Sequence, residues 1–392
     1  MTTHFSRYML LTALAHFALE ICISFLPVVY PLLITAFDLS YSQIGLIALM
    51  SSLFGSLTMP LFGYLSDRFG ANRLVLVSLV WSGVFMGLVG WVGSYTGVLI
   101  VVAFGVLGSA AFHPAGAVLA ANSSAERRGT AMSMFSVGGN IGAALSPLWV
   151  ALGLSWLGRQ GTVIVIPVGI LMALILYQQL NQDAGLQTLK PTSQQPTTAT
   201  RKKADTSVIV GLTLITLVVM TRSWFQLATT TYLPEWVQSQ GGSLTFGGQL
   251  LAVFMISVSV GSMIGGPLSD RLGRWRVVAI SLALLAITQW LFLSVPLVGQ
   301  VILITVMGVM IGASYPVTIV MAQETWPSGV GLASSLVMGI GWAPGGLGAW
   351  VTGWIADRSS LATGLQSLIV VPLVGVMGVL LYAALQRKER EQ

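Results

Sequence analysis

The feature that most constrains this chain is a succession of long apolar runs. Each holds about 20 residues, enough for a helix to cross the roughly 30 Å of hydrocarbon in a bilayer. The runs are continuous and do not alternate with polar residues, so they favour helices over barrel strands. The sequence therefore predicts an all-α polytopic membrane protein with twelve spans, near residues 8–34, 43–65, 74–92, 98–121, 130–154, 162–180, 207–236, 247–268, 277–295, 301–323, 331–355 and 364–385.

Composition excludes other classes of protein. Hydrophobic residues make up 55% of the chain and charged residues 8%, against roughly 25% charged residues in soluble domains. The net charge of +6 could indicate nucleic-acid binding, but the basic residues lie in turns between spans. We therefore expect a lipid bilayer as partner and no nucleic acid. The single cysteine and three histidines show no metal-ligand spacing, and no ATP-binding motif is present, so we predict no metal and no cofactor.

Basic residues also predict the orientation of the chain. Only Arg159 and Arg358 fall on the outer side if the N-terminus is cytoplasmic, and Arg222 falls inside a span. Such an asymmetry favours cytoplasmic N- and C-termini, which we place at the inner membrane of a bacterium. The residues predicted on the cytoplasmic side are Arg7, Arg68, Arg73, Arg127, Arg128, Lys190, Arg201, Lys202, Lys203, Arg271, Arg274, Arg276, Arg387, Lys388 and Arg390.

One turn occurs twice in the chain. Gly63-Tyr-Leu-Ser-Asp67-Arg68-Phe-Gly70 recurs as Gly266-Pro-Leu-Ser-Asp270-Arg271-Leu-Gly273, an offset of 270 − 67 = 203 residues. A polar, Gln/Thr/Pro-rich stretch lies between the copies and is typical of a linker. We predict two pseudosymmetric six-helix bundles, at 1–180 and 207–392, joined by a cytoplasmic linker at 181–206. Parallel repeats of this kind bind substrate near midplane, where the halves meet.

The repeated turn itself is interpreted as a hinge and latch. Its first glycine would let two helices approach closely, and its aspartate could receive a neighbouring helix N-terminus. We expect ion pairs between the bundles to gate the cytoplasmic side, with a solvated turn as the alternative. The predicted gating residues are Asp67, Arg68, Arg73, Asp270, Arg271, Arg274, Glu126, Arg127 and Glu324.

The duplicated Gly-x-x-x-Asp-Arg-x-Gly turn resembles the signature of the major facilitator superfamily. A narrower resemblance, to the fosmidomycin-resistance family of drug exporters, covers nearly the whole chain. It is carried by His16-Phe-Ala-Leu-Glu20, Ser109-Ala-Ala-Phe-His113-Pro114, Phe135-Ser-Val-Gly-Gly-Asn140-Ile-Gly142, Ala322-Gln323-Glu324, and Gly345-Gly-Leu-Gly348 running on to Ile355-Ala-Asp357. The chain departs from that family at Ala115, where an acidic residue commonly stands, and at Leu19-Glu20, where Asn-Asp is frequent.

The resemblance implies a transporter and not an enzyme. Its expected activity is efflux of a small anionic or zwitterionic drug such as fosmidomycin, in exchange for protons, by a chain that can act as a monomer. The alternative has the same fold and the opposite direction of transport: proton-coupled uptake of an organic anion or sugar derivative. An intramembrane enzyme would need a catalytic constellation, and the spans hold too few ionisable groups for one.

Those few ionisable groups are the best functional candidates, because placing a charged side chain at the bilayer centre costs about 2.5–3.5 kcal/mol of free energy. Glu20 lies near midplane of the first span, and His16 shares its helix face four residues earlier, so we expect both to take part in proton coupling. Arg222 corresponds to Leu19 in the first half. We expect Glu20 to load a proton and to compete with substrate for Arg222, whose fixed charge suits carboxylate, phosphonate or phosphate. The alternative is a static ion pair.

The remaining candidates each have two interpretations. His113 precedes Pro114, so it could relay protons or donate a hydrogen bond to a freed carbonyl. Asn140 lies among glycines and could bind substrate or act as dry packing between helices. Three aromatic residues, Trp224, Tyr232 and Trp342, could line the substrate cavity or serve as packing.

Overall fold

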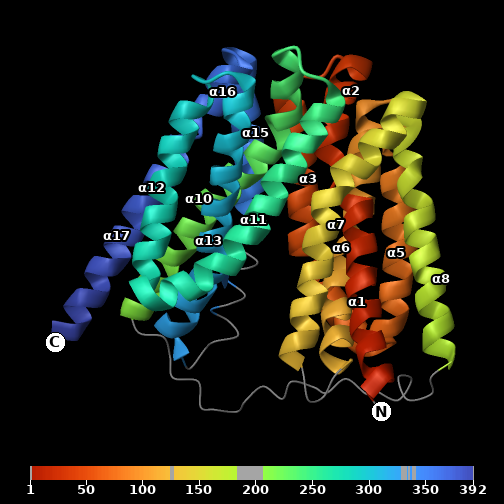
Figure 1. Ribbon diagram of the computed structural model, residues 1–392, viewed down its shortest axis with the longest axis horizontal. Coiled ribbons are helices and arrows are strands. Elements are labelled where there is room, and N and C mark those ends of the chain that lie inside the picture. The colour runs from red at the N-terminus through yellow and green to blue at the C-terminus, as the bar shows by residue number, and fades with distance from the viewer. Residues whose placement is uncertain are drawn as a thin grey trace. The chain divides into compact units, whose positions relative to one another are not determined.

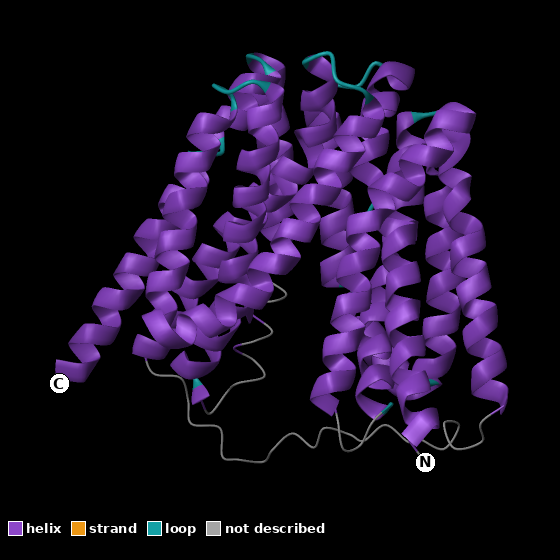
Figure 2. Ribbon diagram, in the orientation of Figure 1, coloured by secondary structure: helices purple, strands orange, loops and turns teal. Residues whose placement is uncertain are grey.

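The computed structural model describes residues 2–123, 128–182, 206–327, 333, 336–337 and 341–391. This part of the chain is helical and has no strand (Figure 2), which confirms the predicted all-α membrane architecture. Ten stretches are long and apolar enough to cross a membrane, and one of them, 131–180, contains two predicted spans. The eleventh predicted span lies partly outside the described residues. The described helices are therefore consistent with the twelve predicted membrane spans.

The helices of the first half run in order from α1 to α8 (Figure 1). Their bounds are α1 Thr2–Ile23, α2 Leu26–Phe37, α3 Tyr41–Leu57, α4 Met59–Phe69, α5 Ala71–Gly87, the short 3-10 helix η1 Leu88–Gly90, α6 Tyr95–Asn122, α7 Arg128–Leu157, the 3-10 helix η2 Gly158–Val165 and α8 Ile166–Gln182. The first predicted span is thus two helices, because Pro27 near the start of α2 cannot donate the next helical hydrogen bond.

The second half continues from α10 to α17. Its elements are α10 Thr206–Ser239, α11 Leu244–Leu272, α12 Arg274–Phe292, α13 Leu297–Thr325, α15 Ala343–Arg358, α16 Leu361–Ser367 and α17 Val370–Glu391. α10 packs mainly against α15 and α17, and α12 packs against α13.

Two compact units make up the chain. The first contains residues 1–38, 53–195 and 242–252, and the second contains 39–52, 196–241 and 253–392. The start of α3 belongs to the second unit because Gly45 allows it to approach α15; a Cβ there would lie 2.9 Å from the Ala349 carbonyl oxygen. The domain boundaries near 180 and 207 stay a prediction.

The repeated turn has the same backbone in both copies. Gly70 (φ 91°) and Gly273 (φ 94°) each end one helix and begin the next, in a conformation that favours glycine. The Gly70 N–H donates to the Ser66 carbonyl at 3.0 Å, and the Gly273 N–H to Ser269 at 2.9 Å. The close helix approach expected at the first glycine of the motif is not found: a Cβ at Gly266 would meet nothing within 4 Å, and one at Gly63 would make only an ordinary contact with the Pro114 Cβ at 4.0 Å. The second glycine is the one the turn requires.

Candidate functional site

Close packing of α1 on α7 positions the polar centre of the first unit. A Cβ on Gly138 would overlap the Ala13 carbonyl, and one on Gly142 would lie 2.9 Å from the Glu20 Cβ. Small residues at this spacing let two membrane helices approach closely. The Ser146 hydroxyl then donates to the Ile21 carbonyl at 2.8 Å and ties the two helices together. The glycine-rich stretch of α7 is therefore the surface on which α1 rests.

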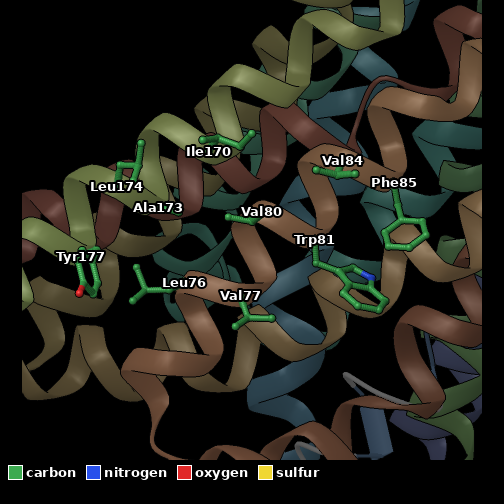
Figure 3. Close-up of a pocket in the computed structure, with 10 residues that line it drawn as sticks. All are labelled: Leu76, Val77, Val80, Trp81, Val84, Phe85, Ile170, Ala173, Leu174 and Tyr177. Atoms are coloured by element: carbon green, nitrogen blue, oxygen red, sulfur yellow. The ribbon is translucent and has the colours of Figure 1, made fainter.

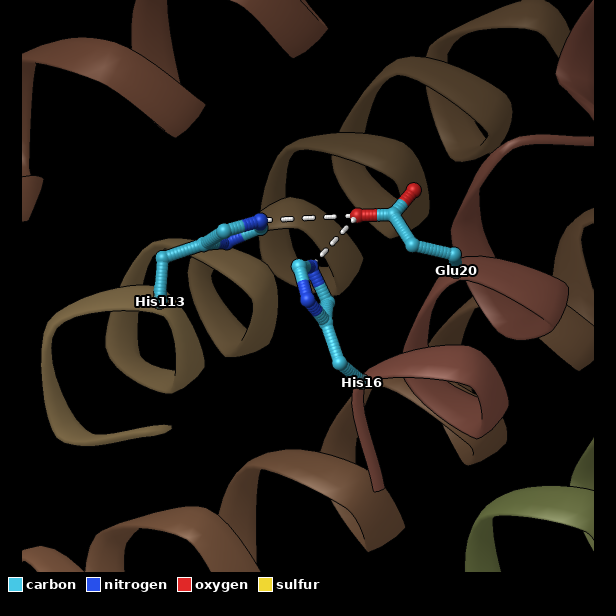
Figure 4. Close-up of side chains that lie close together, drawn as sticks. All are labelled: His16, Glu20 and His113. Atoms are coloured by element: carbon cyan, nitrogen blue, oxygen red, sulfur yellow. Dashed lines mark ion pairs between the residues drawn. The ribbon is translucent and has the colours of Figure 1, made fainter. Parts of the chain in front are cut away.

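His16 is fixed by α7 on two sides. Its Nδ1 lies 2.9 Å from the Phe135 carbonyl oxygen, and its ring stacks on the Phe135 ring with centroids 4.1 Å apart. Gly139 leaves room for the imidazole, since a Cβ there would lie 2.6 Å from both ring nitrogens. His16 is buried, with 8% of its surface exposed. Its remaining nitrogen, Nε2, points toward Glu20 (Figure 4).

His113 reaches the same place from α6. Its Nδ1 lies 2.8 Å from the Ser109 carbonyl oxygen, and its Nε2 lies 3.4 Å from Glu20 Oε1. One ring nitrogen therefore bonds the backbone and the other faces the acid. The bonded carbonyl is that of Ser109, whereas Pro114 frees the carbonyl of Ala110, four residues before it. A role in proton relay stays a prediction. With 31% of its side chain exposed, His113 is the most accessible of the three residues.

The Glu20 carboxylate turns one oxygen toward both rings (Figure 4). Its Oε1 is 3.5 Å from His16 Nε2, while its Oε2 accepts a hydrogen bond of 2.6 Å from the Ser24 hydroxyl. We call His16, Glu20 and His113 the His–Glu–His triad. The predicted shared face of His16 and Glu20 is confirmed, and the structure adds His113 to it. Ser24 was missed, although its position four residues after Glu20 could have indicated it.

The triad is also the group of described residues that could hold a metal. One ligand atom from each of the three lies within 4.8 Å of the others. The sequence predicted no metal site, because spacing along the chain did not reveal that α1 and α6 meet. That prediction remains open.

Arg222 forms the polar centre of the second unit. It lies in α10 with only 1% of its surface exposed. Its Nε and Nη1 are buried and have no hydrogen-bond partner among the described residues. Instead, its Cζ sits 4.5 Å from the centroid of the Tyr315 ring and 5.9 Å from that of Trp342. The predicted competition of Glu20 and substrate for this guanidinium stays a prediction, since the two residues belong to different units.

An aromatic pair supports the guanidinium. Tyr315 in α13 and Trp342, just before α15, meet edge to face with centroids 6.2 Å apart. Trp342 was among the predicted substrate contacts, and its place beside Arg222 keeps it a candidate. Tyr315 was missed, although it precedes Pro316 as His113 precedes Pro114. That correspondence between the halves could have indicated it.

Two other predicted substrate contacts have partners within the protein. The Tyr232 hydroxyl lies 2.9 Å from the carbonyl oxygens of Tyr41 and Ala349, and the residue is 1% exposed. Trp224 Nε1 donates to the Thr352 hydroxyl at 3.2 Å. These bonds hold α10 to α3 and α15, so we leave both residues out of the proposed site.

Asn140 does not occupy the dry packing position that was one of its two interpretations. The residue is exposed, whereas its neighbours Gly138, Gly139 and Gly142 face α1. The glycines therefore do the packing, and the amide points away from the α1 interface. A role in substrate binding stays a prediction.

Comparison with known proteins decides the family. Residues 12–327 and 215–392 match the family model of the Major Facilitator Superfamily. The chain belongs to this superfamily. It is therefore a secondary transporter of the membrane and not an enzyme.

Individual members of the superfamily are similar over nearly the whole chain. The fosmidomycin resistance protein of Escherichia coli is 28% identical over 370 residues, covering 94% of this chain and 91% of that protein. The uncharacterized MFS-type transporter YfnC of Bacillus subtilis is also 28% identical, over 91% and 88% of the two chains. Among solved structures, a bacterial homolog of the human lysosomal transporter Spinster shares the fold, with a TM-score of 0.81 at 16% identity, over 99% and 98% of the chains.

Three of the predicted gating residues, Arg274, Asp270 and Glu324, form an ion-pair network. Arg274 Nη1 lies 2.5 Å from Asp270 Oδ1, and Arg274 Nε lies 3.2 Å from Glu324 Oε1. This network lies inside the second unit, whereas the sequence predicted pairs between the halves. Arg68, Arg73 and Arg271 are exposed. Glu126, Arg127 and the Asp67 side chain lie outside the described residues, and the gating role of the whole set stays a prediction.

A separate cavity lies in the first unit and is lined by none of the triad residues. It is a groove of about 600 Å³ between α5 and α8, lined by Leu76, Val77, Val80, Trp81, Val84, Phe85, Ile170, Ala173, Leu174 and Tyr177 (Figure 3). Its walls are apolar, and several of these side chains are exposed. Such a surface suits contact with lipid acyl chains, so we do not place the transport site there.

Proposed function

We propose that this transporter exports a small anionic or zwitterionic antibiotic, such as fosmidomycin, in exchange for protons. The observation that carries the proposal is the Arg222 site, a buried permanent cation with two nitrogens that lack partners among the described residues. Buried polar groups are ordinarily satisfied, and an unsatisfied one calls for an explanation. A carboxylate or phosphonate would supply both the missing acceptors and the counter-charge.

Aromatic rings beside Arg222 fit this role. Tyr315 and Trp342 attract the cation through their ring faces without neutralising it. The guanidinium thus stays in place and stays charged when substrate leaves. A static ion pair would instead have a carboxylate beside Arg222.

Support for proton exchange comes from the first unit. A carboxylate beside two imidazoles offers groups that can bind and release protons. The direction of transport is supported by the 28% identity to the fosmidomycin resistance protein. We place the chain in the bacterial inner membrane with both termini cytoplasmic and expect it to act as a monomer, following the distribution of basic residues and the presence of both halves in one chain.

A resistance assay tests the proposal. Cells with and without the gene are challenged with fosmidomycin and a panel of other small anionic drugs, and the assay is repeated with a protonophore. We expect protection that the protonophore abolishes. Growth on an organic anion, without protection from any drug, would support uptake instead and overturn the proposed export.

A further inference from the structure

The His–Glu–His triad has the donor set of a transition-metal site. Two imidazole nitrogens and one carboxylate oxygen are the protein ligands of zinc sites that keep a fourth position open. Two of the residues, His16 and Glu20, come from α1, and His113 comes from α6. One ligand atom of each lies within 4.8 Å of the others. Helices distant in the chain thus bring together three ligands that their spacing in the sequence did not reveal.

The distances between these atoms distinguish a metal site from a hydrogen-bonded cluster. Glu20 Oε1 lies 3.5 Å from His16 Nε2 and 3.4 Å from His113 Nε2 (Figure 4). A hydrogen bond from a charged imidazole to a carboxylate is shorter, about 2.7–2.9 Å. Two ligands of a tetrahedral Zn²⁺ ion lie about 3.4 Å apart, because each is about 2.1 Å from the metal. Both separations therefore match the edges of a zinc coordination tetrahedron.

The contacts behind the two ligands on α1 are those that orient a metal site. A histidine that binds a metal through one ring nitrogen ordinarily donates its other N–H to a carbonyl or a carboxylate, and the ligating carboxylate is itself hydrogen-bonded. His16 Nδ1 lies 2.9 Å from the Phe135 carbonyl oxygen, and its Nε2 faces Glu20. The second oxygen of Glu20 accepts a hydrogen bond of 2.6 Å from the Ser24 hydroxyl. Both residues are therefore held as metal ligands are held.

His113 has the same kind of support and is the accessible ligand. Its Nδ1 lies 2.8 Å from the Ser109 carbonyl oxygen and 3.3 Å from the Ser109 hydroxyl, and both oxygens can accept a hydrogen bond. A metal ion at Nε2 itself places the hydrogen on Nδ1, so the site requires no earlier choice of tautomer. The side chain is 31% exposed, against 14% for Glu20. An ion can therefore enter on the side of His113.

We propose that the triad binds a divalent metal ion of the zinc type through Nε2 of His16, Nε2 of His113 and Oε1 of Glu20. The fourth position of the tetrahedron is left for water or another small ligand. The Cys22 thiol is not a ligand, because it donates to the Val165 carbonyl oxygen at 3.4 Å. This site goes beyond the proposed export, since it gives the three groups a ligand other than protons and does not depend on the drug that is carried.

Zinc binding to the purified protein tests the proposal. The full-length chain, without a histidine tag, is placed in lipid nanodiscs, freed of metal with a chelator and titrated with Zn²⁺ in a calorimeter. We expect one ion bound per chain and a higher unfolding temperature in its presence, because a ligand of the folded state stabilises that state. Glu20→Gln and His113→Gln should each abolish both effects. No binding by the wild-type protein, or unchanged binding by the two variants, would overturn the proposal.

Matched variants separate loss of the site from loss of folding. Ser24→Ala removes only a hydrogen bond to the acid, and we expect zinc affinity to fall by about 10–100-fold. Ser24→Thr keeps the hydroxyl and should keep the affinity. His4→Gln removes the third histidine of the chain, and Cys22→Ser removes its one thiol. Neither of these two controls should change zinc affinity, and a loss in either would contradict the assigned ligands.

Substitution of Co²⁺ for Zn²⁺ reports the coordination geometry. Four-coordinate Co²⁺ absorbs visible light strongly and six-coordinate Co²⁺ absorbs it weakly, so we expect strong bands that Glu20→Gln abolishes. The weak bands of a six-coordinate ion in the wild-type protein would overturn the tetrahedral site. These measurements need neither substrate nor a proton gradient. An absence of export in cells would therefore remove the proposed function alone, and an absence of metal binding would remove this inference alone.

Discussion

The two units of this transporter satisfy their central charges in opposite ways. In the first, Glu20 is surrounded by Ser24 and two imidazoles, each of which can form a hydrogen bond to it. In the second, Arg222 rests on aromatic rings and has two nitrogens without partners among the described residues. We propose that the first centre changes its charge with protons and that the second keeps its charge. On this proposal, one unit binds protons and the other binds the anionic substrate.

Replacing the acid should have the largest effect. Glu20→Gln removes the counter-ion of both rings, and we expect proton-driven export to fall to the background of empty liposomes. Export is measured in proteoliposomes with an imposed pH gradient. Exchange of substrate without a gradient is the control, because a folded protein that has only lost coupling should retain it. Normal gradient-driven export by this variant would remove Glu20 from the mechanism.

Arg222→Lys should weaken substrate binding without abolishing folding. Lysine keeps the charge but loses the planar fork and its stacking on Tyr315. Hydrogen bonds to charged groups contribute about 1.5–3 kcal/mol, and about 1.4 kcal/mol corresponds to a factor of ten. We therefore expect a loss of affinity of at least about tenfold, measured by substrate binding to purified protein. The matched control is Arg276→Lys, at an exposed position on α12. Equal effects of the two changes would contradict an anion site at Arg222.

Overpacking beside His16 should have the next largest effect. Gly139→Ala places a Cβ against the His16 ring, 2.6 Å from both its nitrogens. Overpacking of this kind costs about 1–3 kcal/mol, so we expect a lower thermal unfolding temperature and weaker proton coupling. Gly55→Ala is the control in the same unit, since a Cβ there meets nothing within 4 Å. If both variants unfold at the wild-type temperature, His16 is not held as tightly as described.

The exposed ion pair of the second unit should matter least to stability. Glu324 is 54% exposed in its side chain and Arg274 29%, and such pairs contribute about 1 kcal/mol or less. We expect Glu324→Gln to leave the unfolding temperature nearly unchanged. A lower transport rate with unaltered substrate affinity would support the predicted gating role. Unaltered transport would contradict the gating role and leave the ion pair as part of a solvated turn.

Sequence reasoning found the members of both centres more readily than their surroundings. Glu20, His16, His113 and Arg222 stand out because ionisable residues are rare in apolar spans. Their partners are a main-chain carbonyl at Phe135, a serine and a tyrosine, which are common in any chain. Asn140 and Tyr232 each had two interpretations, and the residue type could not choose between them. Helix rotation exposes the first and buries the second.

The sequence by itself determined the helical membrane architecture, since the length and continuity of apolar runs leave the backbone no other way to satisfy its hydrogen bonds in lipid. It also determined the repeated turn, whose second glycine adopts a positive φ in both copies. Only the tertiary structure decided that α6 brings His113 to Glu20 and that Tyr315 lies beneath Arg222. Those contacts depend on how helices distant in the chain rotate and cross, which is set by packing of small residues across their interfaces and not by local sequence.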